Sequence, residues 1–74
     1  MSTTVVFQQN FMANVAAAME KRGWSQRELA RRADVHWQTI NRILSGGMVP
    51  SLDICEKIAN ALELKPERIL KKPA

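Results

Sequence analysis

Three polar side chains in the middle of the chain have the types and spacing to make paired hydrogen bonds. At about 100° per residue, a helix would place Gln38, Asn41 and Arg42 on one face, opposite the apolar Ile40 and Ile43. A side-chain amide can pair bidentately with adenine, and a guanidinium can pair with O6 and N7 of guanine. These three side chains therefore form a polar face with the donors and acceptors that such pairs require.

The residue types needed for catalysis or metal binding are scarce. The single histidine, His36, leaves no cluster for a metal ion or a nucleophile–base pair, and the single cysteine excludes an internal disulfide. The spacing of Cys55 with Ile58 and Leu62 predicts a structural cysteine on a core face. We therefore expect no enzyme activity, no metal site and no cofactor.

Length and charge limit the class of protein further. A chain of 74 residues allows one domain, residues 1–74, and its 46% hydrophobic content favours a globular fold over disorder. The formal net charge is +4. Between residues 21 and 42, six basic residues outnumber two acidic ones, whereas the rest of the chain has five of each. The positive charge therefore lies in one segment, as expected for a protein that binds phosphates.

The N-terminal residues do not have the pattern of a targeting signal. They lack a positive start, and Gln8, Gln9 and Asn10 interrupt the apolar residues. No apolar run approaches the 18 or more residues of a membrane span. We expect a soluble protein without membrane contact, located in the cytoplasm of a bacterial or phage-infected cell.

The spacing of apolar residues predicts an all-α chain of five short helices. Phe7, Phe11 and Val15 form one stripe of a first helix that ends at Gly23. The other helices are expected at about 25–32, 36–44, 51–62 and 66–70, with 71–74 as a tail or the start of a linker. One face of the fourth helix is expected to be apolar, formed by Leu52, Cys55, Ile58, Ala59 and Leu62.

Residues 25–45 have the spacing of two helices joined by a short turn. Ser25 can cap the first of them, and Glu28 lies at the position that closes a capping box. The small side chain of Ala30 would let two steeply crossing helices approach. Asp34 tolerates the left-handed conformation of a tight turn.

The stretch from Gly23 to Leu70 resembles the helix-turn-helix DNA-binding domain of the lambda-repressor and Cro type, also called the XRE family. It departs from the family pattern at Asp34 and Glu63, where glycine is usual, and at His36, where serine or threonine often caps the reading helix. The matching residues are Gly23-Trp24-Ser25-Gln26, Glu28-Leu29-Ala30, Val35, Ile40, Ile43, Gly46, Pro50-Ser51-Leu52 and Ile58-Ala59-Asn60-Ala61-Leu62.

This resemblance implies a transcriptional regulator, such as a phage or bacterial repressor, that binds a palindromic DNA operator as a homodimer and can contact RNA polymerase. Ile69 and Leu70 would belong to the dimer interface. The residues that would read bases are Trp37, Gln38, Asn41 and Arg42. Those that would contact phosphates are Ser25, Gln26, Arg27, Ser45, Gly46 and Gly47. For Trp37, packing on a thymine methyl or the DNA backbone competes with a role as a partly buried rim residue.

Two other functions remain open on the same fold. An antitoxin or a restriction-modification controller would share the helix-turn-helix and act with a partner toxin or enzyme. A protein-interaction adaptor without DNA binding would need an apolar exposed face on the third helix, whereas Gln38, Asn41 and Arg42 make that face polar.

Overall fold

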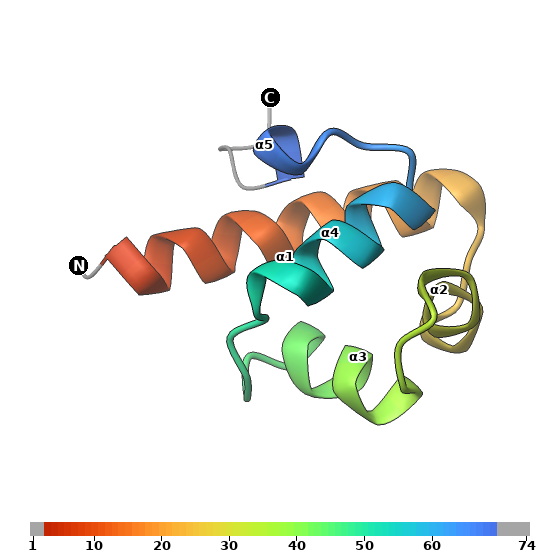
Figure 1. Cartoon of the computed structure of the whole chain (residues 1–74), viewed down its shortest axis with the longest axis horizontal. Helices are drawn as coiled ribbons and strands as arrows, with labels where there is room; N and C mark the ends of the chain where they lie inside the picture. Colours follow the sequence, from red (N-terminus) through yellow and green to blue (C-terminus); the bar gives the residue numbers. More distant parts are fainter. Residues whose placement is uncertain (1–2, 70–74) are drawn as a thin grey trace.

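A computed structural model describes residues 3–69, and every regular element in that range is helical (Figure 1). The elements are α1 (Thr3–Arg22), α2 (Gln26–Ala33), α3 (Trp37–Leu44), α4 (Leu52–Ala61) and α5 (Pro66–Ile69). The predicted all-α class is confirmed. The predicted fifth helix amounts to a single turn of four residues. Leu70 and the predicted tail at 71–74 lie outside the described residues.

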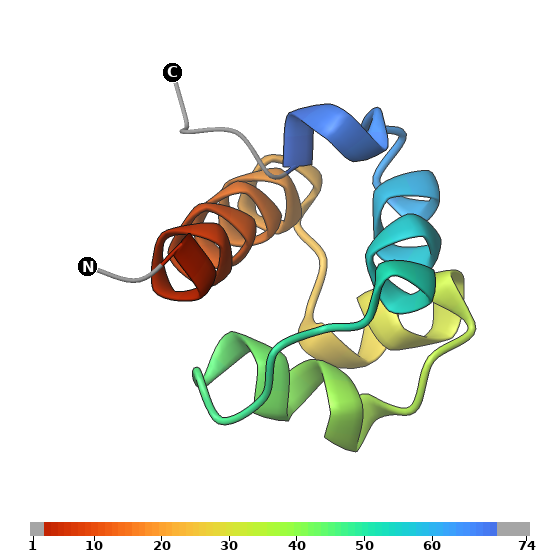
Figure 2. The ribbon, with the colours of Figure 1, turned by 60° about the vertical axis from the view of Figure 1, so that its left-hand side comes forward.

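The helices are arranged so that α2 and α3 occupy one side of the molecule and α5 the opposite side (Figures 1 and 2). Helix α2 packs against both α3 and α4, and α5 packs against α1 and α4. Figure 2 shows α5 crossing from α1 to α4, with α3 on the far side of both. The long helix α1 and α4 therefore serve as a frame that holds the α2–α3 pair.

Apolar side chains from all five helices meet in one core. The predicted stripe of α1 is confirmed there, since Phe11 and Val15 are fully buried and Phe7 packs partly buried against them. The other large side chains of the core are Leu29, Ile40, Ile43, Ile58, Leu62 and Ile69. Burial of these side chains from several helices supplies the main stabilisation of the fold.

Leu52 departs from the predicted core face of α4. Cys55, Ile58 and Ala59 on that face are buried, but the Leu52 side chain is 69% exposed. Leu52 is the first residue of α4. Helical periodicity places it on the core side, but burial also requires a neighbouring element over the first turn, and this end of the helix is uncovered.

Local signals set the ends of α2 and α4. The Ser25 hydroxyl accepts a hydrogen bond from the Glu28 backbone amide (3.1 Å), and Ser51 does the same for Ile54 (3.3 Å). Both serines are therefore N-caps, as predicted. Only half of the predicted capping box forms, because the Glu28 carboxylate bonds Arg31 and Arg32 instead of reaching back to residue 25.

The turn between α2 and α3 is closed by a residue in the left-handed conformation. Asp34 has φ 56° and ψ 47°, as the sequence predicted for a tight turn. The Val35 amide donates to the Ala30 carbonyl (3.0 Å) and so satisfies the end of α2. His36 is the N-cap of α3 without a side-chain cap bond, and α3 begins one residue later than predicted.

Candidate nucleic-acid interface

The α2–α3 pair forms a helix-turn-helix whose second helix shows one apolar and one polar face. Ile40 and Ile43 are buried against the core, and Ala30 of α2 is buried beside them. Gln38, Asn41 and Arg42 are exposed on the other face of α3. The packing of α3 therefore presents these three residues together.

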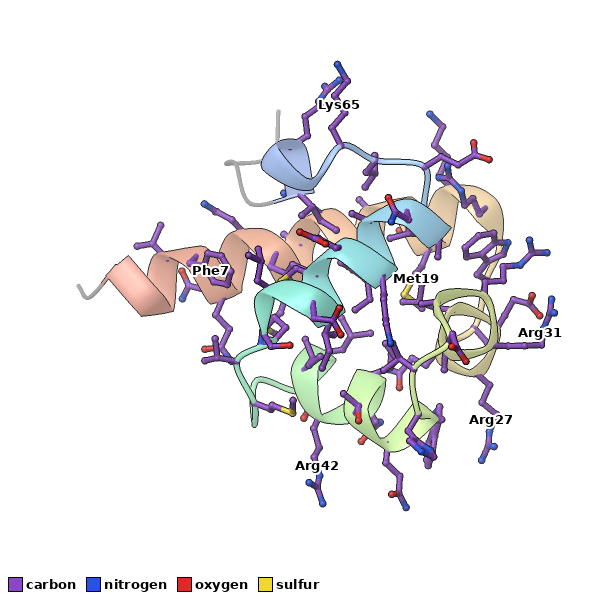
Figure 3. The ribbon with its side chains drawn as sticks, viewed as in Figure 1. Phe7, Met19, Arg27, Arg31, Arg42 and Lys65 are labelled. Carbon is purple, nitrogen blue, oxygen red and sulfur yellow. The ribbon has the colours of Figure 1, made fainter. Side chains whose placement is uncertain are left out.

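Arg27 of α2 and Arg42 of α3 are directed toward the same side of the molecule (Figure 3). Lys65 lies on the opposite side. Neither Arg27 nor Arg42 takes part in an ion pair within the described part of the chain. Two guanidinium groups without an ion-pair partner therefore lie on this side, Arg42 on the polar face of α3 and Arg27 beside it, where they can attract an anion.

Asn41 is hydrogen-bonded to α2. Its Nδ2 donates to Oε1 of Gln26 across 3.1 Å. Gln26 is the first residue of α2, and its Nε2 group keeps its donors for another partner. The predicted base-reading residue and the predicted phosphate-binding residue thus form one pair, which the sequence analysis did not anticipate.

Trp37 is also engaged with α2. The guanidinium carbon of Arg27 lies 4.4 Å from the centroid of the Trp37 ring, within the range of a cation–π contact. The Trp37 residue is still 38% exposed. Trp37 thus lies at the rim of the α3 face with its ring against Arg27, and nothing in the sequence spacing indicated this contact.

The other predicted phosphate contacts lie at two helix ends, Ser25 before α2 and Ser45 and Gly46 after α3. Ser25 caps α2 beside Gln26 and Arg27, where the positive end of the helix dipole favours anions. Ser45 and Gly46 follow the negative end of α3, where Ser45 Oγ donates to the Arg42 carbonyl (3.0 Å).

The amides of Gly46 and Gly47 donate to the carbonyls of Ile43 and Arg42. Gly46 has φ 84°, the left-handed conformation that closes a helix C-terminus. The backbone donors of Gly46 and Gly47 therefore already have partners inside the protein, unlike the side-chain donors of Gln26 and Arg27.

The basic segment predicted from the sequence is divided between two surfaces. Arg31 points to a different side from Arg27 and Arg42 in Figure 3, and it pairs with Glu28. Arg32 also bonds Glu28 (2.6 Å), and its guanidinium lies 4.4 Å from the Trp24 ring centroid. Hydrogen bonds from Arg31 and Arg32 lower the pKa of the Glu28 carboxyl. The single Glu28 carboxylate is shared by both guanidinium groups, so the charge of this cluster is partly compensated, and the cluster lies beside the candidate interface.

Two residues named from the sequence are core residues in the structure. Ile69, predicted at a dimer interface, is fully buried within its own chain, and its carbonyl accepts a bond from Asn14 Nδ2 (2.8 Å). Cys55 is buried, and desolvation raises the pKa of its thiol, with the Glu56 carboxylate adding to the shift. Ile69 therefore offers no surface for a second chain in this conformation.

Neither a metal cluster nor a membrane-spanning helix is found among the residues whose side chains the structure describes. No three side chains of histidine, cysteine, aspartate or glutamate gather there as metal ligands. No described helix combines the length and apolar content needed to cross a bilayer.

Comparison with known proteins identifies the arrangement. The crystal structure of a hypothetical transcription factor NHTF from Neisseria superimposes with a TM-score of 0.86 at 25% sequence identity, covering 90% of this chain and 77% of that one. No curated protein matches the chain. The helix-turn-helix family HTH_3 matches residues 15–69, which span α2, α3 and α4 and most of the core. The chain therefore belongs to the HTH_3 family of helix-turn-helix proteins.

Proposed function

We propose that this protein is a transcription regulator that binds specific sequences of duplex DNA by placing α3 in the major groove. Its membership of a helix-turn-helix family and its likeness to a hypothetical transcription factor support a DNA-binding regulator. The observation that carries the proposal is the two-sided character of α3. Ile40 and Ile43 fix the helix to the core, and this leaves Gln38 and Arg42 exposed.

Base recognition in this proposal depends on Gln38 and Arg42. The amide of Gln38 can donate to and accept from adenine, and the Arg42 guanidinium can donate two hydrogen bonds to guanine. Both side chains are exposed. Gln38 lies in the first turn of α3, the part of a recognition helix that meets base edges, and Arg42 lies in its last turn. Base contacts by Trp37 and Asn41 stay predictions, since each of these residues also contacts α2.

Phosphate binding depends on the start of α2. Gln26 and Arg27 supply side-chain donors there, and the helix dipole adds a positive potential. Such contacts fix the register of the protein on the duplex without reading its sequence. The Ser25 hydroxyl accepts from the Glu28 amide and keeps its own proton, so it is proposed as a secondary phosphate contact. Ser45 and Gly46 could donate to phosphate only by giving up the bonds that the Ser45 hydroxyl makes to Arg42 and the Gly46 amide makes to Ile43.

We further propose that the protein acts as a homodimer on a palindromic operator and represses transcription, in a bacterium or in a phage-infected cell, by hindering RNA polymerase. A symmetric dimer of helix-turn-helix domains requires two half-sites about one helical turn apart, roughly 34 Å or 10 base pairs. A folded unit of this size has a small core, so pairing with a second copy would add to its stability.

Selection of binding sites from a pool of random duplexes tests these points together. The expected result is a consensus with approximate dyad symmetry and half-sites separated by one turn. Equal recovery of all sequences would contradict specific reading and would favour an adaptor without DNA specificity. A consensus that lacks symmetry, with one chain bound per duplex, would retain DNA reading but contradict the dimer.

A further inference from the structure

We propose that Trp37 contributes to DNA binding through Arg27, as a positioning residue whose indole ring holds the Arg27 guanidinium ready for a backbone phosphate. This inference rests on the proposed DNA-binding function. The contact that carries it is the 4.4 Å separation between the Arg27 guanidinium carbon and the Trp37 ring centroid. It changes the predicted role of Trp37 from base reading to the support of a phosphate ligand.

The contact joins the starts of the two helices of the helix-turn-helix. Arg27 is the second residue of α2, and Trp37 is the first residue of α3. Both residues are exposed, so the pair lies on the surface and not in the core. A cation–π contact at this place keeps the Arg27 side chain near Gln26, at the helix end where anions are favoured.

The position of the Arg27 charge is electrostatically unfavourable unless an anion binds beside it. Cations are disfavoured near the positive end of a helix dipole, and Arg27 is in the first turn of α2. Arg22, Arg31 and Arg32 each lie within 4.0 Å of a carboxylate, but no ion pair among the side chains that the structure describes includes Arg27. Its charge is therefore available to a ligand, and the Trp37 ring provides a favourable contact without neutralising that charge.

The geometry of a stacked guanidinium suits this role. When a guanidinium packs its flat face on an aromatic ring, its hydrogen-bond donors lie in the plane of the group and are not covered by the ring. Those donors can therefore bond phosphate oxygens while the stack is kept. Holding the long side chain in place before binding reduces the conformational entropy that is lost on association.

A double-mutant cycle tests the coupling on DNA. The variants are R27A, W37L, which keeps apolar bulk without an aromatic face, W37F, which restores the face, and R27A with W37L. Affinity is measured for the selected operator and for a scrambled duplex over a range of salt concentrations. We expect R27A and W37L to weaken both duplexes by similar factors, and R27A to lower the slope of log K against log salt by about one.

W37F should recover most of the loss, and W37L should add little in the R27A background. The inference would be overturned if W37L altered base preference at one position, or if its effect on affinity were the same with and without Arg27. In either case, Trp37 would act on DNA independently of Arg27.

A measurement on the free protein separates this inference from the proposed function. The side-chain resonances of Arg27 should be shifted by the ring current of Trp37 in the wild type and in W37F, and the shift should disappear in W37L. Far-ultraviolet circular dichroism of each variant shows whether α1–α5 are intact. A ring-current shift in a wild-type protein that binds no duplex would refute the proposed function alone. If the wild-type protein binds DNA but shows no ring-current shift at Arg27, the role of Trp37 is refuted and the proposed function is not.

Discussion

Asn41 on α3 donates a hydrogen bond from its amide nitrogen to Oε1 of Gln26 at the start of α2, across 3.1 Å. The bond fixes which way the Gln26 amide faces, because its oxygen is occupied and its nitrogen remains a free donor. A residue expected to read bases is thereby tied to one expected to bind phosphate. The proposed phosphate contact then depends on the position of the recognition helix.

This pair gives a prediction for Asn41→Ala. Loss of the bond should leave the Gln26 amide without a fixed orientation, so affinity for the operator and for a scrambled duplex should fall by similar factors. Fluorescence anisotropy with both duplexes measures the two affinities. Q26A is the matched control, and N41A should add little to it if the two side chains act together. Loss of preference at one base pair in N41A would show that Asn41 reads that base directly.

Arg42 is expected to determine one base pair of the operator. It is directed away from the body of the molecule (Figure 3) and has no ion-pair partner among the described side chains, so its donors are available. R42A should cost about 1–3 kcal/mol on the best site and relax preference at that position. R42K is the control, because it keeps the charge without the planar fork. If R42A weakened a scrambled duplex as much as the operator, Arg42 would be a phosphate ligand.

Because the basic segment is divided between two surfaces, replacing Arg27 and replacing Arg31 should change the salt dependence of DNA affinity differently. Arg31 is paired with Glu28 and points away from the side where Arg27 and Arg42 lie. R31Q should therefore leave the slope of log K against log salt nearly unchanged, whereas R27Q should lower it by about one. Titrations of one duplex at several salt concentrations give both slopes. If R31Q lowered the slope as much as R27Q, Arg31 would also contact DNA phosphates.

Ile69 should control stability and not association. Its side chain is fully buried, so I69A should cost about 2–5 kcal/mol of the free energy of unfolding through lost burial and a residual cavity. L52A is a control with an exposed leucine, and its cost should stay within about 0.5 kcal/mol. Urea unfolding gives both values, and sedimentation gives the oligomeric state. If I69A changed the oligomeric state but not the free energy of unfolding, Ile69 would belong to a dimer interface.

The Cys55 thiol should be slow to react in the folded protein. It is buried, and desolvation raises its pKa, so both access and the fraction of thiolate are reduced at pH 8. Alkylation by iodoacetamide should be many times slower than in urea, and should accelerate in the destabilised I69A variant. Native alkylation as fast as in urea would show that Cys55 is exposed in solution.

The sequence by itself determined the helices and the two faces of α3. The apolar spacing around Ile40 and Ile43 and the caps at Ser25 and Ser51 were all predicted and are confirmed. These features depend on residues within a turn or two along the chain. Helical periodicity and capping are local interactions, so a single sequence contains them.

Only the tertiary structure decided which side chains meet across helices and which are covered. Asn41 and Gln26 are fifteen residues apart, Trp37 meets Arg27 across the turn, and no periodic pattern relates the members of either pair. The same holds for Ile69, whose burial requires the core built by the other helices. A helical pattern gives the direction of a side chain relative to its own axis. The neighbour that the side chain meets is set by the packing of helices distant in the chain.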